Sequence, residues 1–120
     1  MMRIYISHPI TLGDGCDNFY DCCKVQQLLM EAGYAVLNPG LSMMHPNGKN
    51  IPWQRWIDSD LKWVEVADMV VRLPGESKGA DVECEHARKC GIPVYSPYLF
   101  PCLRELFPEP PQPHFMVKAA

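Results

Sequence analysis

Short apolar runs alternate with longer amphipathic segments along this chain of 120 residues, and glycine or proline separates most of them. The apolar runs predict strands at residues 3–7, 34–38, 69–73 and 92–96. The amphipathic segments predict helices at residues 17–32, with Asp17 as the N-cap, and at residues 52–67 and 79–90. Because strands that alternate with helices form parallel sheets with right-handed crossovers, we expect an α/β sandwich with helices on both faces. The expected strand order is 2-1-3-4, which becomes 2-1-3-4-5 if residues 98–107 add a short edge strand.

Acidic residues occupy two helical positions that should be apolar. The core-facing stripe of the helix at 79–90 consists of Ala80, Glu83, Cys84 and Ala87. In the helix at 52–67, Asp60 lies between Trp56 and Trp63 at the border of the buried face. A buried acid is usually paired, so an ion pair between Glu83 and Arg72 is one interpretation. The other is that Glu83 is a nucleophile or base facing the crevice at the carboxyl ends of the strands, where ligands of such sheets bind.

Composition limits the classes of protein to which the chain can belong. The chain has 48% hydrophobic and 21% charged residues, which is ordinary for a globular protein, and its length suits one domain. We expect that domain to span residues 1–107 and the proline-rich residues 108–120 to form an extended tail. A net charge of −3 without a basic run argues against binding to a nucleic acid polymer. No apolar stretch approaches the ~20 residues of a membrane span, and the N-terminus enters a strand without a secretory signal, so we expect a cytoplasmic protein without membrane contact.

The six cysteines and four histidines form no recognisable disulfide or zinc pattern. No Cys-x-x-Cys pair occurs, and Cys22 and Cys23 are adjacent on a predicted helix. We therefore expect free thiols that serve as small core side chains, and neither a metal nor another cofactor.

In the expected strand order the ends of the first and third strands are neighbours, so residues 5–8 and 77–83 share one crevice. Glu83, Asp60 and Tyr5 then converge on it. Two carboxylates that flank a site, with a phenol to orient one of them, suit cleavage of a glycosidic bond. One carboxylate attacks the anomeric carbon, and the other handles the proton on the leaving group.

Two adjoining segments could hold the rest of a substrate. Ser77, Lys78 and Gly79 form a helix entry with free backbone N–H groups, which favours an anion. The loop predicted at residues 39–50 and the helix after it contribute the large apolar side chains of Met43, Met44, Trp53 and Trp56. These would form a flat slot for a nucleobase, with simple core packing as the alternative for each of them.

Two motifs resemble those of a known family. The opening Ile4-Tyr5-Ile6-Ser7-His8-Pro9 resembles the Y-x-[AS]-G-P start of the nucleoside 2-deoxyribosyltransferase superfamily, with His8 in place of the usual glycine. Ser77-x-Gly79-x-x-x-Glu83, followed by Ala87 and Gly91-Ile92-Pro93-Val94, resembles its [DS]-x-G-x-x-x-E…A…G-[IK]-P-V block. Asp60 falls where the family keeps an aspartate that contacts base or ribose. The resemblance covers residues 3–96, and compact phage and bacterial relatives are similar to this chain.

The resemblance implies a flavodoxin-like, Rossmann-like three-layer sandwich that forms homodimers or larger oligomers. It implies that Glu83 is the nucleophile of a glycosyl-enzyme intermediate, that Tyr5 holds it, and that Asp60 acts at the base or ribose. Serine at position 77, where transferases of free nucleosides tend to carry aspartate, is typical of the branch that hydrolyses 5′-monophosphates. An acid there would repel a phosphate, whereas Ser77, Lys78 and Gly79 would attract it, and we expect Ser7 and His8 to reach the same phosphate.

We therefore expect cleavage of the N-glycosidic bond of a (deoxy)nucleoside 5′-monophosphate, with deoxyribosyl transfer to another base as a side activity. The main alternative is a nucleotide-binding module of the same fold without catalysis, in which Glu83 is merely paired. A third hypothesis is a cytokinin-activating phosphoribohydrolase, whose P-G-G-x-G-T-x-x-E block only partly matches Pro74-Gly75 and Gly79 to Glu83.

Overall fold

The computed structural model describes residues 1–9, 15–43 and 50–96, within which strands and helices alternate. In chain order the elements are β1 (Arg3–Ser7), α1 (Gly15–Glu31), β2 (Ala35–Leu37), α2 (Pro39–Met43), α3 (Trp53–Val64), β3 (Met69–Arg72), α4 (Lys78–Lys89) and β4 (Val94–Tyr95). The fifth strand expected at residues 98–107 and the proline-rich tail at 108–120 lie outside the described residues.

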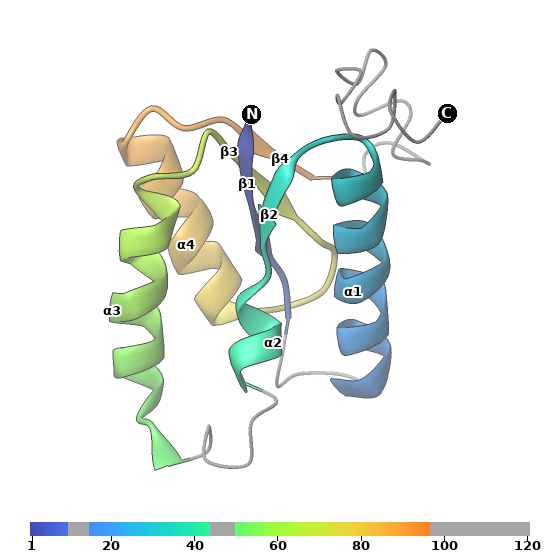
Figure 1. Cartoon of the computed structure of the whole chain (residues 1–120). Helices are drawn as coiled ribbons and strands as arrows, with labels where there is room; N and C mark the ends of the chain where they lie inside the picture. The colour runs from blue at the N-terminus through green and yellow to red at the C-terminus, as the bar shows by residue number, and fades with distance from the viewer. Residues whose placement is uncertain (10–14, 44–49, 97–120) are drawn as a thin grey trace.

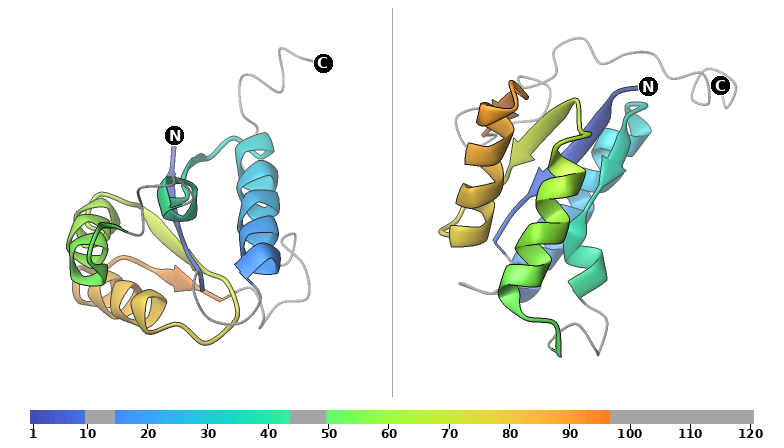
Figure 2. Two further views of the ribbon diagram at one scale, coloured as in Figure 1. Left: turned by 90° about the horizontal axis from the view of Figure 1, so that it is seen from below. Right: turned by 90° about the vertical axis from the view of Figure 1, so that its left-hand side faces the viewer.

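The four described strands form one parallel sheet in the order β2-β1-β3-β4. Helix α1 covers one face of this sheet, and α3 and α4 lie together over the other (Figures 1 and 2). This arrangement confirms the expected α/β sandwich and its 2-1-3-4 order. It also places the carboxyl ends of β1 and β3 side by side, with Ser7 opposite Arg72 in the strand register.

Side chains along the two central strands, β1 and β3, point alternately to the two faces of the sheet, so the core has two parts. Ile4 and Ile6 of β1 pack toward α1, in a cluster that includes Cys22 and Leu29. Tyr5 faces the opposite way and packs in a second cluster beneath α3 and α4, formed by Tyr5, Val64, Val70, Cys84 and Ala87. Because side chains in a strand alternate between faces, Ser7 lies on the same side as Tyr5. The α4 side of the sheet therefore carries a phenol and a hydroxyl within a largely apolar layer.

Most predicted elements are confirmed, with boundaries shifted by a few residues. The first strand is found as predicted, whereas α1 begins at Gly15 rather than after Asp17. Pro52 is the N-cap of α3 instead of its first helical residue. Trp63 on α3, expected near the border of the buried face, is 55% exposed.

The predicted loop at residues 39–50 is wrong in its first part, because Pro39–Met43 forms the short helix α2. Asn38 accounts for this start, since its side-chain oxygen accepts a hydrogen bond from the Gly40 amide (3.1 Å). A Cβ atom at Gly40 would lie 2.7 Å from Nε2 of His8, so a glycine is needed there. The end of β1 and the start of α2 therefore pack directly against each other.

Within the described residues, Cys22, Cys23, Cys84 and Cys90 form no disulfide. Cys22 and Cys84 are buried as small core side chains, as expected, whereas Cys90 is exposed. Within the described ranges, no helix has the length and apolar character needed to cross a membrane.

Candidate active site

Two carboxylates are buried where α3 and α4 pack over the sheet. Glu83 on α4 is 4% exposed and Asp60 on α3 is 8% exposed. Both sequence-predicted acids therefore lie inside the protein, on neighbouring helices. Such groups are costly to bury unless they are hydrogen-bonded, so their partners determine what they can do.

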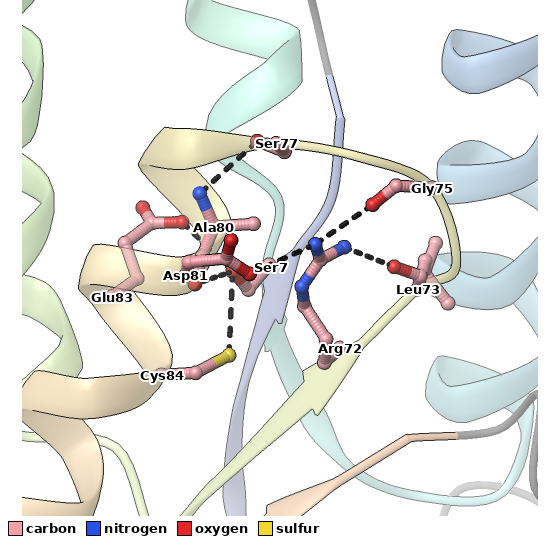
Figure 3. A network of polar contacts seen from close by, with 9 residues as sticks. All are labelled: Ser7, Arg72, Leu73, Gly75, Ser77, Ala80, Asp81, Glu83 and Cys84. Carbon is pink, nitrogen blue, oxygen red and sulfur yellow. Dashed lines mark hydrogen bonds and ion pairs between the residues drawn. The ribbon is translucent and has the colours of Figure 1, made fainter.

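Glu83 is held by hydroxyl groups from β1. The Tyr5 hydroxyl donates a hydrogen bond to Oε2 of Glu83. The Ser7 hydroxyl lies 2.8 Å from Oε1 of Glu83 and 3.4 Å from the carbonyl oxygen of Ala80 (Figure 3). Each carboxylate oxygen therefore has its own donor, which fixes the plane and direction of the group.

No cation neutralises Glu83 in the described part of the chain. Arg72, the partner that one interpretation of the sequence assigned to it, instead contacts Asp81 with its Nη2 atom 3.3 Å from Oδ1. The ion pairs found among the described residues involve other acids, namely Glu65 and Asp81. The ion-pair interpretation of Glu83 is therefore wrong.

Glu83 and Asp60 form one proton-sharing unit. Burial raises the pKa of Glu83 to about 7; hydrogen bonds from Tyr5 and Ser7 oppose this shift, and the Asp60 carboxylate adds to it. Burial likewise raises the pKa of Asp60 to about 6, against hydrogen bonds with Glu83 and Tyr5. Because two interacting carboxylates release their protons in two steps that belong to the pair, the pair keeps a proton at a pH at which a free carboxyl is ionised.

Tyr5 remains a hydrogen-bond donor throughout the ordinary pH range. Its side chain is 1% exposed, and burial together with the Glu83 carboxylate raises its pKa well above the usual value. The phenol therefore orients Glu83 and does not itself take part in proton transfer near neutral pH.

The first turn of α4 lies beside the start of α3. The Ser77 hydroxyl caps α4 by accepting a hydrogen bond from the Ala80 amide (3.1 Å). The Lys78 ammonium lies 5.2 Å from the centre of the Trp53 ring. A Cβ atom at Gly79 would come within 3.3 Å of Ile57, so the small residue permits close packing of the two helices.

Other residues singled out in the sequence lie in different settings. His8 is buried, with Nδ1 2.8 Å from the Pro9 carbonyl and Nε2 3.2 Å from Oδ1 of Asn38, so protein oxygens occupy both ring nitrogens. Burial lowers its pKa. Trp56 is half-buried on α3. The side chain of Met43, at the end of α2, and the whole of Met44 lie outside the described residues.

Sequence reasoning missed the residues that fix the loops around the acids. Arg72 binds the loop that follows it, and Asn38 joins His8 to the start of α2. Asn38, directly before Pro39-Gly40, carried a signal, since asparagine commonly caps such turns. The described residues contain no group of three or more histidine, cysteine or acidic side chains placed to hold a metal ion.

Comparisons with known proteins agree with this arrangement. The family described as "Domain of unknown function (DUF4406)" matches residues 2–96. A 2-deoxyribosyltransferase from the bacterium Bacillus psychrosaccharolyticus has a similar structure, with a TM-score of 0.63 and 21% identity over 79% of this chain and 72% of that one. A 2-desoxiribosyltransferase from Leishmania mexicana is similar with a TM-score of 0.57 and 17% identity over 80% of this chain and 63% of that one. Among curated proteins no sequence match is found. The expected resemblance to the nucleoside 2-deoxyribosyltransferases is thus confirmed in the fold.

The raised pKa of Glu83 predicts that stability falls as pH rises. The buried neutral carboxyl stabilises the fold fully below its unfolded pKa of 4.5, and this contribution is lost as pH rises through about 7. The difference between the unfolded pKa of 4.5 and the folded pKa of about 7 corresponds to a decrease on the order of 3 kcal/mol in the free energy of unfolding. Urea unfolding at pH 4.5 and pH 8 measures this decrease. The raised pKa of Asp60 should lower the free energy of unfolding further as pH rises.

Glu83→Gln should retain the hydrogen-bonding shape and remove the share of this pH dependence that belongs to Glu83. Glu85→Gln is the matched control, because Glu85 lies on the same helix but is exposed. An unchanged pH dependence in Glu83→Gln would contradict the assignment of the raised pKa to Glu83.

Proposed function

Because the chain belongs to the family described as "Domain of unknown function (DUF4406)" and shares the fold of 2-deoxyribosyltransferases, we propose that it cleaves N-glycosidic bonds of (deoxy)nucleoside 5′-monophosphates. The observation that carries this proposal is the environment of Glu83. This carboxylate is buried, held through both oxygens by Tyr5 and Ser7, and paired with a second acid instead of a cation. A structural acid also needs hydrogen bonds to be buried, but it gains no stability from a second acid beside it.

The proposed reaction is a double displacement at the anomeric carbon. A carboxylate oxygen of Glu83 attacks this carbon, a new C–O ester bond forms, and the bond to the nucleobase breaks. The bonding electron pair leaves on the base nitrogen, which gains a proton. Water then attacks the same carbon and releases sugar phosphate and the Glu83 carboxylate. If a second base replaces water in this step, the outcome is deoxyribosyl transfer.

Asp60 supplies and recovers the proton in this scheme. Because the pKa values of both acids are raised, the pair keeps a proton near neutral pH. For the attack, this proton must lie on Asp60 and Glu83 must be ionised. The hydrogen bonds that Tyr5 and Ser7 donate favour ionised Glu83, but burial outweighs them and leaves Glu83 with the higher pKa. In this scheme the proton therefore moves from Glu83 to Asp60 before the attack.

Ser7 contributes to the nucleophile in this proposal more than to the substrate. Its side chain is fully buried and its hydroxyl is directed at Glu83. We assign to Ser7 and Tyr5 the task of orienting Glu83, and to half-buried Trp56, one turn before Asp60 on α3, a contact with the nucleobase.

The start of α4 is the proposed binding site of the 5′-phosphate. Ser77, Lys78 and Gly79 provide a hydroxyl, an ammonium and backbone N–H groups at the positive end of the helix, about a turn and a half before Glu83. A phosphate bound there would place the attached sugar near the carboxylates. The neutral hydroxyl at position 77 allows this, whereas a carboxylate would repel the phosphate.

Removal of the nucleophile should abolish the activity. We expect the wild type to release free base from deoxynucleoside 5′-monophosphates, detected by chromatography, and Glu83→Ala to lower kcat by about 10³-fold or more. Glu85→Ala, an exposed change on the same helix, should retain the wild-type rate. No base release by the wild type, or equal release by Glu83→Ala, would reject the proposed reaction.

The charge at position 77 should determine the preference for phosphate. Aspartate is as good an N-cap as serine, so Ser77→Asp should keep the stability of α4. We expect this variant to raise KM for the monophosphate by about tenfold or more, because the carboxylate repels the phosphate, and to leave KM for the unphosphorylated nucleoside nearly unchanged. Steady-state kinetics with the two substrates test this. An equal effect on both would place the phosphate elsewhere.

A further inference from the structure

We propose that Arg72 is a positioning residue for the reaction. Its side chain holds the loop between β3 and α4 in the conformation that places Glu83 beside Tyr5 and Ser7. This inference rests on the proposed function. Arg72 is the last residue of β3, lies opposite Ser7 in the sheet, and has a side chain that is only 12% exposed. Its role is distinct from the ion pair with Glu83 that the sequence suggested.

The Arg72 guanidinium binds the loop in two places. Its Nη1 group donates to the carbonyl oxygen of Leu73, and its Nη2 group donates to the carbonyl oxygen of Gly75 at 2.8 Å (Figure 3). The two carbonyls lie on either side of Pro74 in the loop. A single planar group that takes both of them fixes the path of the chain out of β3.

The same loop is anchored to β1 by two further contacts. The Leu73 amide donates to the carbonyl oxygen of Ser7 at 2.9 Å. Gly75 has a φ of +119°, and a Cβ atom there would lie 2.7 Å from Pro9, so the turn rests closely on the chain that follows β1. Arg72 therefore closes a short connection between the strand that carries Ser7 and the helix that carries Glu83.

This connection matters because α4 begins three residues beyond Gly75. The Ser77 cap and the first turn of the helix set its direction, and Glu83 follows on the second turn. Its distances to Tyr5 and Ser7 depend on that direction. A displacement of about 1 Å at a reacting group can lower the rate by about 10²-fold, so an untied loop should reduce kcat even though Arg72 does not touch Glu83.

The Asp81 contact contributes little to this role. Asp81 is 74% exposed and its oxygen lies 3.3 Å from Arg72, which is the geometry of a weak surface pair. The guanidinium lies closer to the two loop carbonyls, with Nη2 2.8 Å from the Gly75 oxygen. Arg88 provides a matched control, because it lines the same surface pocket as Arg72 and carries the same charge, but it is an exposed residue of α4.

The test compares Arg72→Met, Arg72→Lys, Asp81→Asn and Arg88→Met in the full chain, with circular dichroism to verify folding. We expect both Arg72 variants to lower kcat by about 10²-fold for monophosphate and for unphosphorylated nucleoside alike. Lysine should fail as a substitute because its ammonium cannot span the two carbonyls. Asp81→Asn and Arg88→Met should remain within about twofold of the wild type.

Amide hydrogen exchange gives a readout that needs no activity. The Ala80 and Asp81 amides are bonded to Ser77 in the first turn of α4. We expect them to exchange about tenfold faster in both Arg72 variants and unchanged in Arg88→Met. If the reaction itself has been wrongly assigned, every variant will be inactive, yet this pattern of exchange will still appear.

Three results would overturn the proposal. Full activity in Arg72→Lys would show that charge alone matters. A loss confined to KM for the monophosphate would make Arg72 a direct phosphate ligand. Unchanged exchange of the Ala80 and Asp81 amides in Arg72→Met would show that the loop does not depend on this side chain.

Discussion

The hydrogen bond between the Tyr5 hydroxyl and the Glu83 carboxylate is the interaction on which the arrangement of this protein depends. It joins the central strand to α4 inside a layer that is otherwise apolar. Burying a carboxylate there is costly, and the hydroxyl groups of Tyr5 and Ser7 offset part of that cost, whereas the neighbouring Asp60 carboxylate adds to it. The result is an acid with a fixed orientation, a raised pKa and no cationic partner among the described residues, a combination that is common at functional sites and differs from a structural ion pair.

The fold makes this interaction possible through the order of its strands. Because β1 is central and β3 lies beside it, the ends of both strands and the start of α4 meet at one edge of the sheet. The alternation of β1 then directs Tyr5 and Ser7 toward α4, while Ile4 and Ile6 face α1. The site is thus a consequence of the pattern in one five-residue strand and of the helix opposite it.

Much of this was predictable from the sequence, because periodicity and helix signals determine the elements and a parallel sheet restricts their order. The burial of Glu83 followed from its place on the apolar stripe of α4. The family resemblance implied Tyr5 as its partner, whereas position on a helix alone could not exclude an ion pair with Arg72 at the end of β3. Helix α2 was not predicted because a Pro-Gly pair such as Pro39-Gly40 normally terminates a helix or strand. Here the Asn38 side chain binds the Gly40 amide, and His8 packs closely against Gly40. Trp63 was expected on the buried side, yet it is exposed at an apolar groove that also includes Leu37 and Val66.

The chemical claim at the centre of this account is that Glu83 becomes covalently bound to the sugar. Incubation with a 2-fluoro-arabino nucleoside 5′-monophosphate, whose fluorine slows the second displacement, should trap this ester for intact-mass and peptide analysis. The account predicts a stoichiometric adduct of fluorosugar phosphate on Glu83, which disappears in Glu83→Gln. Base release without any adduct, or an adduct located on Asp60, would contradict it.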